Sequence, residues 1–319
     1  MKHIFIINPV SGTTNPETYL RKNIEKVAHE LSIDYQIVLT KYPGHAKELA
    51  ESFSKSQEPV RFYACGGDGT FNEVVEGTLG YPNADTACIP CGSGNDFIRN
   101  FGSKEDFLDL KNMIQGSRCK IDVIKTQYGI ATAICSAGLD AQVAYGIPKF
   151  RRIPFCGGET SYKLSIITSL CSKLGHKLRI VADSEVFEDE FLMLAICNGM
   201  TYGGGFKAAP QADMQDGLLD LVMVKKISRL RIAKVVNIYK QGKHLIDGCV
   251  IPEFQDVMTF RRVKEVHIQV LDQRPIVITK DGECAPRMQL DANVEPCIAN
   301  IVVPKSIYDR SLSSNPYKK

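Results

Sequence analysis

A glycine-rich segment carries the residues best suited to chemistry. It reads Gly66-Gly67-Asp68-Gly69-Thr70-Phe71-Asn72-Glu73 and stands between an apolar strand pattern at residues 60–65 and a helical pattern. Glycines let backbone N–H groups approach a phosphate closely, and a helix N-terminus adds free donors and a favourable dipole. Asp68 would stand beside the phosphates, where a carboxylate can organise a metal ion or a water. Thr70 and Glu73 have capping-box spacing, which predicts that the helix begins at Thr70.

Glycines can also serve merely to turn the chain, so this segment alone favours phosphate binding only modestly. Small polar loops follow the other predicted strands as well. They are Asn8-Pro9-Val10-Ser11-Gly12, Thr40-Lys41-Tyr42-Pro43-Gly44-His45-Ala46 and Pro90-Cys91-Gly92-Ser93-Gly94-Asn95-Asp96-Phe97. Because the carboxyl ends of parallel strands meet at one edge of a sheet, we expect these loops to converge there and form a binding site.

The elements that position these loops alternate in type up to about residue 120. Short β-branched runs at residues 4–7, 37–40, 60–65 and 87–90 alternate with helical patterns at 17–31, 45–54, 70–79 and 104–115. This alternation predicts a parallel sheet wrapped by helices.

The pattern changes from residue 121 onward. Extended segments are predicted at 121–126, 130–136, 177–182, 191–198, 218–224, 266–271 and 275–279, with helical insertions at 162–174 and 228–242. We therefore expect an α/β domain at residues 1–125, an antiparallel β-domain at 126–300, and a C-terminal tail at 301–319 that packs back on the first domain.

Composition excludes several classes of protein. A chain of 319 residues favours two domains, and 39 basic against 36 acidic residues give a net charge of +3, too balanced for electrostatic binding of nucleic acid. The 11 cysteines are odd in number and scattered, which indicates reduced thiols, and the Cys88/Cys91 pair lacks a partner pair for zinc. We find no signal-peptide core or transmembrane segment, so we expect a cytoplasmic protein.

Together the motifs resemble the catalytic domain of diacylglycerol kinases and of the related sphingosine and ceramide kinases. The resemblance rests first on the three glycine-containing loops that follow the first, third and fourth predicted strands. It continues through Asn198-Gly199, Tyr202-Gly203-Gly204-Gly205-Phe206, Ala209-Pro210, Asp216-Gly217-Leu218-Leu219-Asp220 and Asp281-Gly282-Glu283, and covers roughly residues 3 to 300.

This resemblance implies an α/β nucleotide-binding domain followed by a β-sandwich, with the active site between them, and an ATP- and Mg²⁺-dependent lipid kinase that acts at a membrane surface. Glu283, supported by Asp281, is similar to the general base, which would accept the proton of the attacking alcohol. The charged network of the cleft would contain Asp68 and Asp96, with Asp122 as a further candidate. The ATP positions would be Asn8, Ser11, Thr40, Gly66, Gly67, Asp68, Gly69, Thr70, Asn72, Ser93 and Asp96, and the structural magnesium would be held by Asp213, Asp216 and the backbone carbonyl of Leu218. The soluble bacterial members suggest a homodimer.

Both Asp-Gly pairs have a purely structural interpretation as well. Asp281-Gly282 between extended runs is a strong hairpin signal, and a hairpin could equally present Glu283 to a substrate. Asp216-Gly217 also reads as a turn, and only the resemblance makes Asp213 and Asp216 metal ligands.

Five interpretations remain open from the sequence, three of them for the lipid headgroup. The headgroup could belong to diacylglycerol, a sphingoid base or another lipid alcohol. An NAD kinase would share the Gly-Gly-Asp-Gly-Thr turn, and a silent nucleotide or lipid sensor would share the fold.

Two basic stretches, Lys149-Phe150-Arg151-Arg152-Ile153-Pro154-Phe155 and the helix after residue 227, could dock on an anionic bilayer, although such runs are usually solvated surface.

Overall fold

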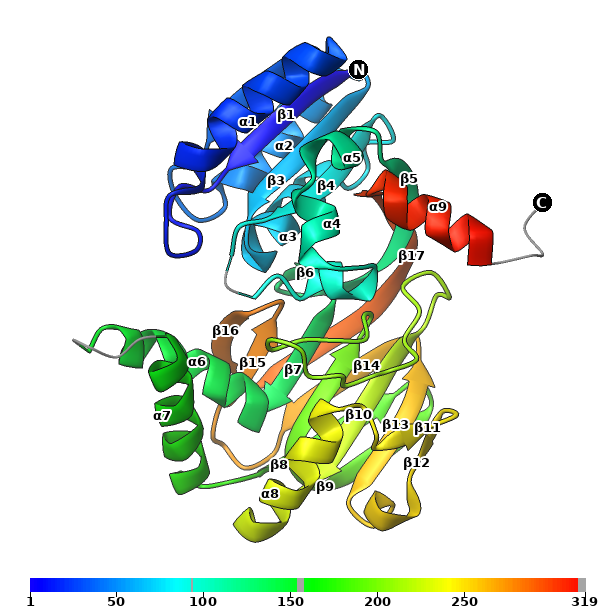
Figure 1. Cartoon of the computed structure of the whole chain (residues 1–319). Coiled ribbons are helices and arrows are strands. Elements are labelled where there is room, and N and C mark those ends of the chain that lie inside the picture. Colours follow the sequence, from blue (N-terminus) through cyan, green and yellow to red (C-terminus); the bar gives the residue numbers. More distant parts are fainter. Residues whose placement is uncertain (93, 154–157, 315–319) are drawn as a thin grey trace. The chain divides into compact units, whose positions relative to one another are not determined.

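The computed structural model describes residues 1–92, 94–153 and 158–314, which form two compact units (Figure 1). Unit 1 consists of Met1–Asp122 and Cys297–Lys319, and unit 2 of Val123–Pro296. The expected combination of an α/β domain with a β-sandwich-like domain is confirmed.

A parallel sheet forms the centre of unit 1. Its strand order is β17-β4-β3-β1-β2, with β1 parallel to β2 and β3, and β4 parallel to β3 and β17. The strands are β1 (Lys2–Ile7), β2 (Tyr35–Leu39), β3 (Val60–Gly66), β4 (Ala84–Pro90) and the end of β17 (Gln289–Val303). Every residue of β3 and β4 is buried, as expected for apolar strands covered on both faces.

Helices follow each strand of unit 1. They are α1 (Pro16–Leu31), α2 (His45–Ser54), α3 (Asp68–Thr78), the 3-10 turn η1 (Phe97–Asn100), α4 (Lys104–Leu108), α5 (Leu110–Ile114) and α9 (Lys305–Ser314). The single helix predicted at 104–115 is wrong, because the backbone of Asp109 is extended and its carboxylate caps α5 by accepting from Asn112 N at 3.0 Å. The α9 segment contacts α5, where Asn112 and Ser306 exchange two hydrogen bonds.

Unit 2 contains an antiparallel sheet. Its strand order is β16-β15-β7-β9-β8-β14-β17, and β10 pairs with β9 and β13. The strands are β5 (Ser117–Thr126), which starts in unit 1, β6 (Gly129–Ala131), β7 (Ile134–Gly138), β8 (His176–Ala182), β9 (Glu185–Cys197), β10 (Leu219–Lys225), β11 (Leu245–Ile246), β12 (Cys249–Val250), β13 (Met258–Val263), β14 (Glu265–Val270), β15 (Ile276–Lys280) and β16 (Glu283–Arg287).

Helices of unit 2 are α6 (Leu139–Arg151), α7 (Gly158–Cys171), α8 (Arg229–Lys240) and the short η2 (Pro252–Phe254). The two predicted insertions correspond to α7 and α8, but α6 was not predicted. Gly146 and Pro148 interrupt its sequence pattern, and both are poor residues for a helix interior. Figure 1 shows α6 beside α7, and the two helices pack together. Among the described residues, no helix has the length and apolarity needed to cross a membrane.

Candidate functional site

The loops after the parallel strands of unit 1 do converge. The Asn8 side chain donates to the Thr70 hydroxyl at 3.0 Å, which joins the loop after β1 to α3. The Gly66 carbonyl accepts from the backbone of Cys91 at 2.8 Å and of Gly92 at 3.1 Å, which joins the ends of β3 and β4. Gly12 has φ +77°, and a Cβ there would lie 2.5 Å from the Cys91 carbonyl oxygen. This packing confirms the predicted convergence.

Glycine is required where the loops after β3 and β4 approach each other. A Cβ on Gly92 would lie 2.6 Å from the Cα of Gly67, and no flexible atom could move aside to make room. Gly67 is also the N-cap residue of α3 and supplies no side chain to cap the helix. The N-terminus of α3 therefore has no side-chain cap from its N-cap residue, a feature that it shares with phosphate-binding loops.

The predicted capping box of Thr70 and Glu73 is wrong. Helix α3 begins at Asp68, two residues earlier, and Thr70 lies inside its first turn. The Glu73 carboxylate instead accepts from Gly44 N at 2.8 Å and Ala46 N at 3.1 Å, at the N-terminus of α2. Glu73 thus ties the loop after β2 to α3, a long-range role that spacing within one helix could not indicate.

Asp68 organises the loop after β4. Its two carboxylate oxygens accept from the backbone N–H groups of Asp96 and Phe97, each at 3.1 Å. Asp96 in turn lies 3.2 Å from Arg99. Asn95 is not among the predicted site residues, yet its φ of +51° and its hydrogen bonds with Gly92 close this loop.

The remaining expected ATP positions lie around the same loops. The Ser11 N–H donates to the Asn8 carbonyl at 3.2 Å, the Thr40 N–H donates to the Ile7 carbonyl at 2.9 Å, and Asn72 is buried in α3. A Cβ on Gly69 would meet nothing within 4 Å. Ser93 lies outside the described residues, as does Phe155 of the basic stretch.

In unit 2, Glu283 stands at the start of the strand returning from a tight hairpin. Lys280 pairs with Glu283 across a loop formed by Asp281 (φ +43°) and Gly282 (φ +90°), and positive φ at both loop residues is typical of a type I′ turn. The hairpin prediction is therefore confirmed. The Glu283 side chain is 54% exposed and lies 3.2 Å from Lys280 Nζ.

Asp281 fixes this hairpin to the strands beneath it. Its buried carboxylate accepts from the backbone N–H groups of Thr132, Ala133 and Ile134 and from the Thr132 hydroxyl. Burial raises the pKa of Asp281, and these hydrogen bonds oppose the rise. The arrangement holds the backbone beside Glu283 in one position.

One of the expected magnesium ligands, Asp216, pairs with an arginine. Asp216 accepts from Leu218 N at 3.0 Å and from the Arg262 guanidinium at 2.9 Å, and Arg262 also contacts Asp220 at 3.0 Å. The carboxylate of Asp213 accepts from Gln215 N at 3.0 Å. Carboxylate and carbonyl oxygens are the donors that magnesium prefers. A cation here would nevertheless share Asp216 with Arg262, and no three His, Cys, Asp or Glu residues of the described chain are grouped to hold a metal.

A cavity of about 610 Å³ lies next to the Glu283 hairpin. Helices α6 and α7 and the hairpin line it, with Tyr145, Phe150 and Cys284 among the wall residues and two exposed cations, Lys149 and Arg152. Its full lining is Gln142, Ala144, Tyr145, Gly146, Pro148, Lys149, Phe150, Arg152, Thr168, Ser169, Gly282 and Cys284. Apolar walls beside a carboxylate are suited to a lipid whose polar end faces the hairpin.

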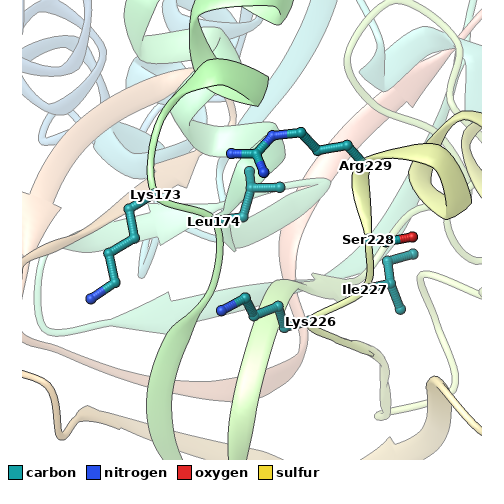
Figure 2. Close-up of a pocket in the computed structure, with 6 residues that line it drawn as sticks. All are labelled: Lys173, Leu174, Lys226, Ile227, Ser228 and Arg229. Atoms are coloured by element: carbon teal, nitrogen blue, oxygen red, sulfur yellow. The ribbon is translucent and has the colours of Figure 1, made fainter.

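A second cavity of about 450 Å³ lies at the start of α8, where Figure 2 shows Lys173, Lys226 and Arg229 around it. The Arg229 guanidinium donates to the carbonyls of Leu170 and Ser172, and Lys226 pairs with Glu190 at 2.9 Å. These contacts join α7, β9 and α8, so two of the three cations have structural partners.

Comparisons with known proteins match both units. A family model described as "Diacylglycerol kinase catalytic domain" matches residues 2–126, and one described as "YegS C-terminal NAD kinase beta sandwich-like domain" matches residues 133–303. A protein of Bacillus subtilis named diacylglycerol kinase is 28% identical over 77% of this chain and 81% of its own length. One of the same name from Staphylococcus aureus is 28% identical over 98% of this chain and 95% of its own. A crystal structure of a diacylglycerol kinase from Bacillus anthracis shares the fold, with a TM-score of 0.66 at 19% identity over 96% of this chain and 98% of that one.

Proposed function

Because this chain belongs to the diacylglycerol kinase family, as a lipid kinase with a YegS-type C-terminal domain, we propose that it transfers the γ-phosphoryl group of ATP to the hydroxyl group of diacylglycerol. The products are ADP and phosphatidic acid. The relatives named diacylglycerol kinase support this choice of substrate. The glycine-rich loop at the start of α3 supports the proposed binding of the ATP phosphates.

ATP would bind with its phosphates at the first turn of α3. Gly66, Gly67 and Gly92 keep that surface free of side chains, and Asn8 and Asp68 hold its two sides by their hydrogen bonds. Backbone donors aligned with a helix dipole stabilise charge that develops on the transferred group without rearranging during the reaction.

Magnesium is part of this proposal. Bound with ATP, it would neutralise charge on the phosphate oxygens. A second, structural magnesium is proposed at Asp213, Asp216 and the Leu218 carbonyl, where it would compete with Arg262 for Asp216.

Glu283 would act as general base. The lipid oxygen attacks the γ-phosphorus, the bond to the β,γ-bridging oxygen breaks, and the hydroxyl proton passes to the Glu283 carboxylate. The exposed position of Glu283 and the anchoring of the hairpin by Asp281 support this role. The same carboxylate lies 3.2 Å from Lys280 Nζ, a contact that restricts where the side chain of Glu283 points.

The acyl chains would occupy the cavity between α6 and α7. The end of α6 carries exposed Lys149, Arg151 and Arg152, followed by Ile153, which is 47% exposed. Cations beside an exposed apolar side chain are suited to an anionic membrane surface, where each basic residue adds about 1 kcal/mol. The lipid would therefore be taken up from a bilayer that this end of α6 contacts.

Transfer of label from the γ-phosphate of ATP tests the reaction. The purified chain, with magnesium, is given mixed micelles of dioleoylglycerol and, in a separate reaction, NAD. Labelled phosphatidic acid is the expected product. Label in NAD, or in no lipid, would contradict the proposal.

A further inference from the structure

The cavity of about 450 Å³ at the start of α8 takes no part in the proposed kinase reaction. Its lining consists of Lys173, Leu174, Lys226, Ile227, Ser228 and Arg229. Leu174 and Ile227 are buried in an apolar cluster that they share with residues of α8, so part of the wall is apolar. The other four lining residues are polar and exposed. A cavity of this volume is large enough for a small organic ligand.

Three cations surround this cavity. Figure 2 shows the side chains of Lys226 and Arg229 extending toward the segment that carries Lys173. The carboxylate of Glu190 pairs with Lys226 Nζ at 2.9 Å. The Lys173 side chain makes no ion pair or hydrogen bond with any residue that the structure describes. Three cations and one paired carboxylate therefore leave two positive charges around the cavity.

Two of these cations are held in place by the surrounding chain. The Arg229 guanidinium donates to the Leu170 carbonyl at 2.6 Å and to the Ser172 carbonyl at 3.0 Å. Nε and Nη2 make these bonds, so Nη1 has no acceptor in the described part of the chain. A Cβ on Gly175 would lie 3.0 Å from Lys226 Cδ, so a side chain there would crowd the lysine. Cations that are already oriented lose less entropy when they bind an anion.

The neighbouring charges do not neutralise the cavity, because they pair with one another. Lys225 contacts Asp189, and Arg274 contacts Asp272. The Ser228 hydroxyl caps α8 as an acceptor and can still donate its own proton. The dipole of α8, which begins at this wall, also favours an anion. A phosphate monoester has a charge of about −1.5 to −2 at neutral pH, which matches the two positive charges of the cavity.

We propose that this cavity binds an organic phosphate monoester. The phosphate would lie between Lys173, Lys226 and Arg229, since guanidinium and ammonium groups both bind phosphate oxygens. The organic group would contact Leu174 and Ile227. The site lies in unit 2, whereas the loop proposed to bind the ATP phosphates belongs to unit 1. The inference does not depend on the proposed kinase reaction. A soluble organic phosphate and the headgroup of phosphatidic acid both carry the required group.

Titration calorimetry at constant ionic strength tests the inference. The probes are hexyl phosphate, its methyl ester, and dihexanoyl phosphatidic acid below its critical micelle concentration. The methyl ester is a diester with a single negative charge, so it should bind at least about tenfold more weakly than hexyl phosphate. Tighter binding of dihexanoyl phosphatidic acid than of hexyl phosphate would identify a lipid as the ligand, and the reverse order a soluble phosphate. Both orders support the inference.

Lys173→Glu shows whether the probes bind at this cavity. It reverses the charge of a cation that has no structural partner, so Kd for hexyl phosphate should rise at least about tenfold without loss of melting temperature. Lys177→Glu is the matched control, because it makes the same change at an exposed lysine of β8 that does not line the cavity. Its Kd should stay within about twofold of that of the unsubstituted chain, since water and salt screen a more distant charge.

Two results would overturn the inference. One is that none of the probes binds to the unsubstituted chain. The other is that hexyl phosphate binds equally well to Lys173→Glu and to the unsubstituted chain, because the phosphate would then bind elsewhere. Neither result bears on the proposed function, which the transfer of label from ATP to dioleoylglycerol tests separately.

Discussion

The side-chain amide of Asn8 donates a hydrogen bond to the hydroxyl of Thr70 at 3.0 Å, although 62 positions separate them in the sequence. The oxygen of the same side-chain amide accepts a hydrogen bond from Val10 N at 3.2 Å. One residue therefore both shapes the loop after β1 and holds that loop against the first turn of α3, where the phosphates are proposed to bind.

Replacing Asn8 with alanine should weaken ATP binding. The loss of one partly buried hydrogen bond between the two loops corresponds to about 1 to 1.5 kcal/mol, so KM for ATP should rise about tenfold. Asn15→Ala is the matched control, because Asn15 lies in the same loop and caps α1 by accepting from Glu17 N. It should cost about 1 kcal/mol of stability and leave KM for ATP unchanged. An equal rise of KM in both variants would refute the role of Asn8.

Asp140→Asn should stabilise the protein at neutral pH. Burial raises the folded-state pKa of this carboxyl from the ordinary 3.8 to about 6, so the native state favours the protonated form. Stability from this group is greatest below pH 3.8 and is lost as the pH rises through about 6, by at most about 3 kcal/mol. In urea unfolding at pH 7.5, the free energy of unfolding of Asp140→Asn should exceed that of the unsubstituted chain. The difference should be smaller at pH 4.5.

Asp281→Asn is the contrasting variant. The Asp281 carboxylate is also buried, but it accepts hydrogen bonds from four donor groups of Thr132, Ala133 and Ile134. An amide can replace only part of that acceptor capacity and places a donor against N–H groups. The free energy of unfolding of this variant should therefore fall by about 2 to 4 kcal/mol. If Asp140→Asn lost stability at pH 7.5 as Asp281→Asn does, Asp140 would have a partner that stabilises its charge.

Magnesium should raise the melting temperature of the protein in the absence of ATP, provided that Asp216 takes part in a structural site. The shift should vanish in Asp216→Asn. Asp220→Asn serves as the control, because Asp220 also contacts Arg262 but is not an expected ligand. Thermal unfolding with and without millimolar magnesium chloride measures this. No shift in the unsubstituted chain would show that Arg262 alone neutralises these carboxylates.

The double charge reversal Arg151→Glu/Arg152→Glu should weaken binding to vesicles that contain anionic phospholipid. Reversing two charges near the surface changes the electrostatic free energy by several kcal/mol at low salt, so the bound fraction should fall at least tenfold. Lys22→Glu/Lys26→Glu on α1 provides the same change of charge on another exposed helix. The bound fraction is measured by vesicle sedimentation. An equal bound fraction for the two double variants would show that the end of α6 is not the docking surface.

Much of unit 1 could be predicted because its information is local. Short apolar runs mark β1, β3 and β4, and the glycines mark the loops that follow them. Two predictions in unit 1 were wrong, the capping box of Thr70 and Glu73 and the single helix at 104–115. Glu73 caps α2 rather than its own helix, which depends on a contact between distant parts of the chain. Asp109 interrupts the predicted helix and caps α5.

Unit 2 was less predictable. Helix α6 contains Gly146 and Pro148, which obscure its periodicity, and β17 alternates only partly between buried and exposed residues. Asp140 stands alone in an apolar stretch of sequence, and the burial that raises its pKa depends on tertiary packing that its neighbours in the sequence do not indicate. The hairpin at Asp281-Gly282 was predictable because two-residue loops have strict backbone requirements.

The central claim, a lipid kinase with Glu283 as general base, is tested most directly by comparing Glu283→Gln with Glu185→Gln. Both glutamates begin the returning strand of a two-residue hairpin, both are about half exposed at 54% and 50%, and both pair with a cation, Lys280 or Arg261. With dioleoylglycerol as acceptor, kcat of Glu283→Gln should fall about 100- to 10,000-fold without loss of melting temperature, as expected for removal of a general base. Glu185→Gln should retain full activity. Comparable activity of the two variants would contradict the assignment of Glu283 as the base.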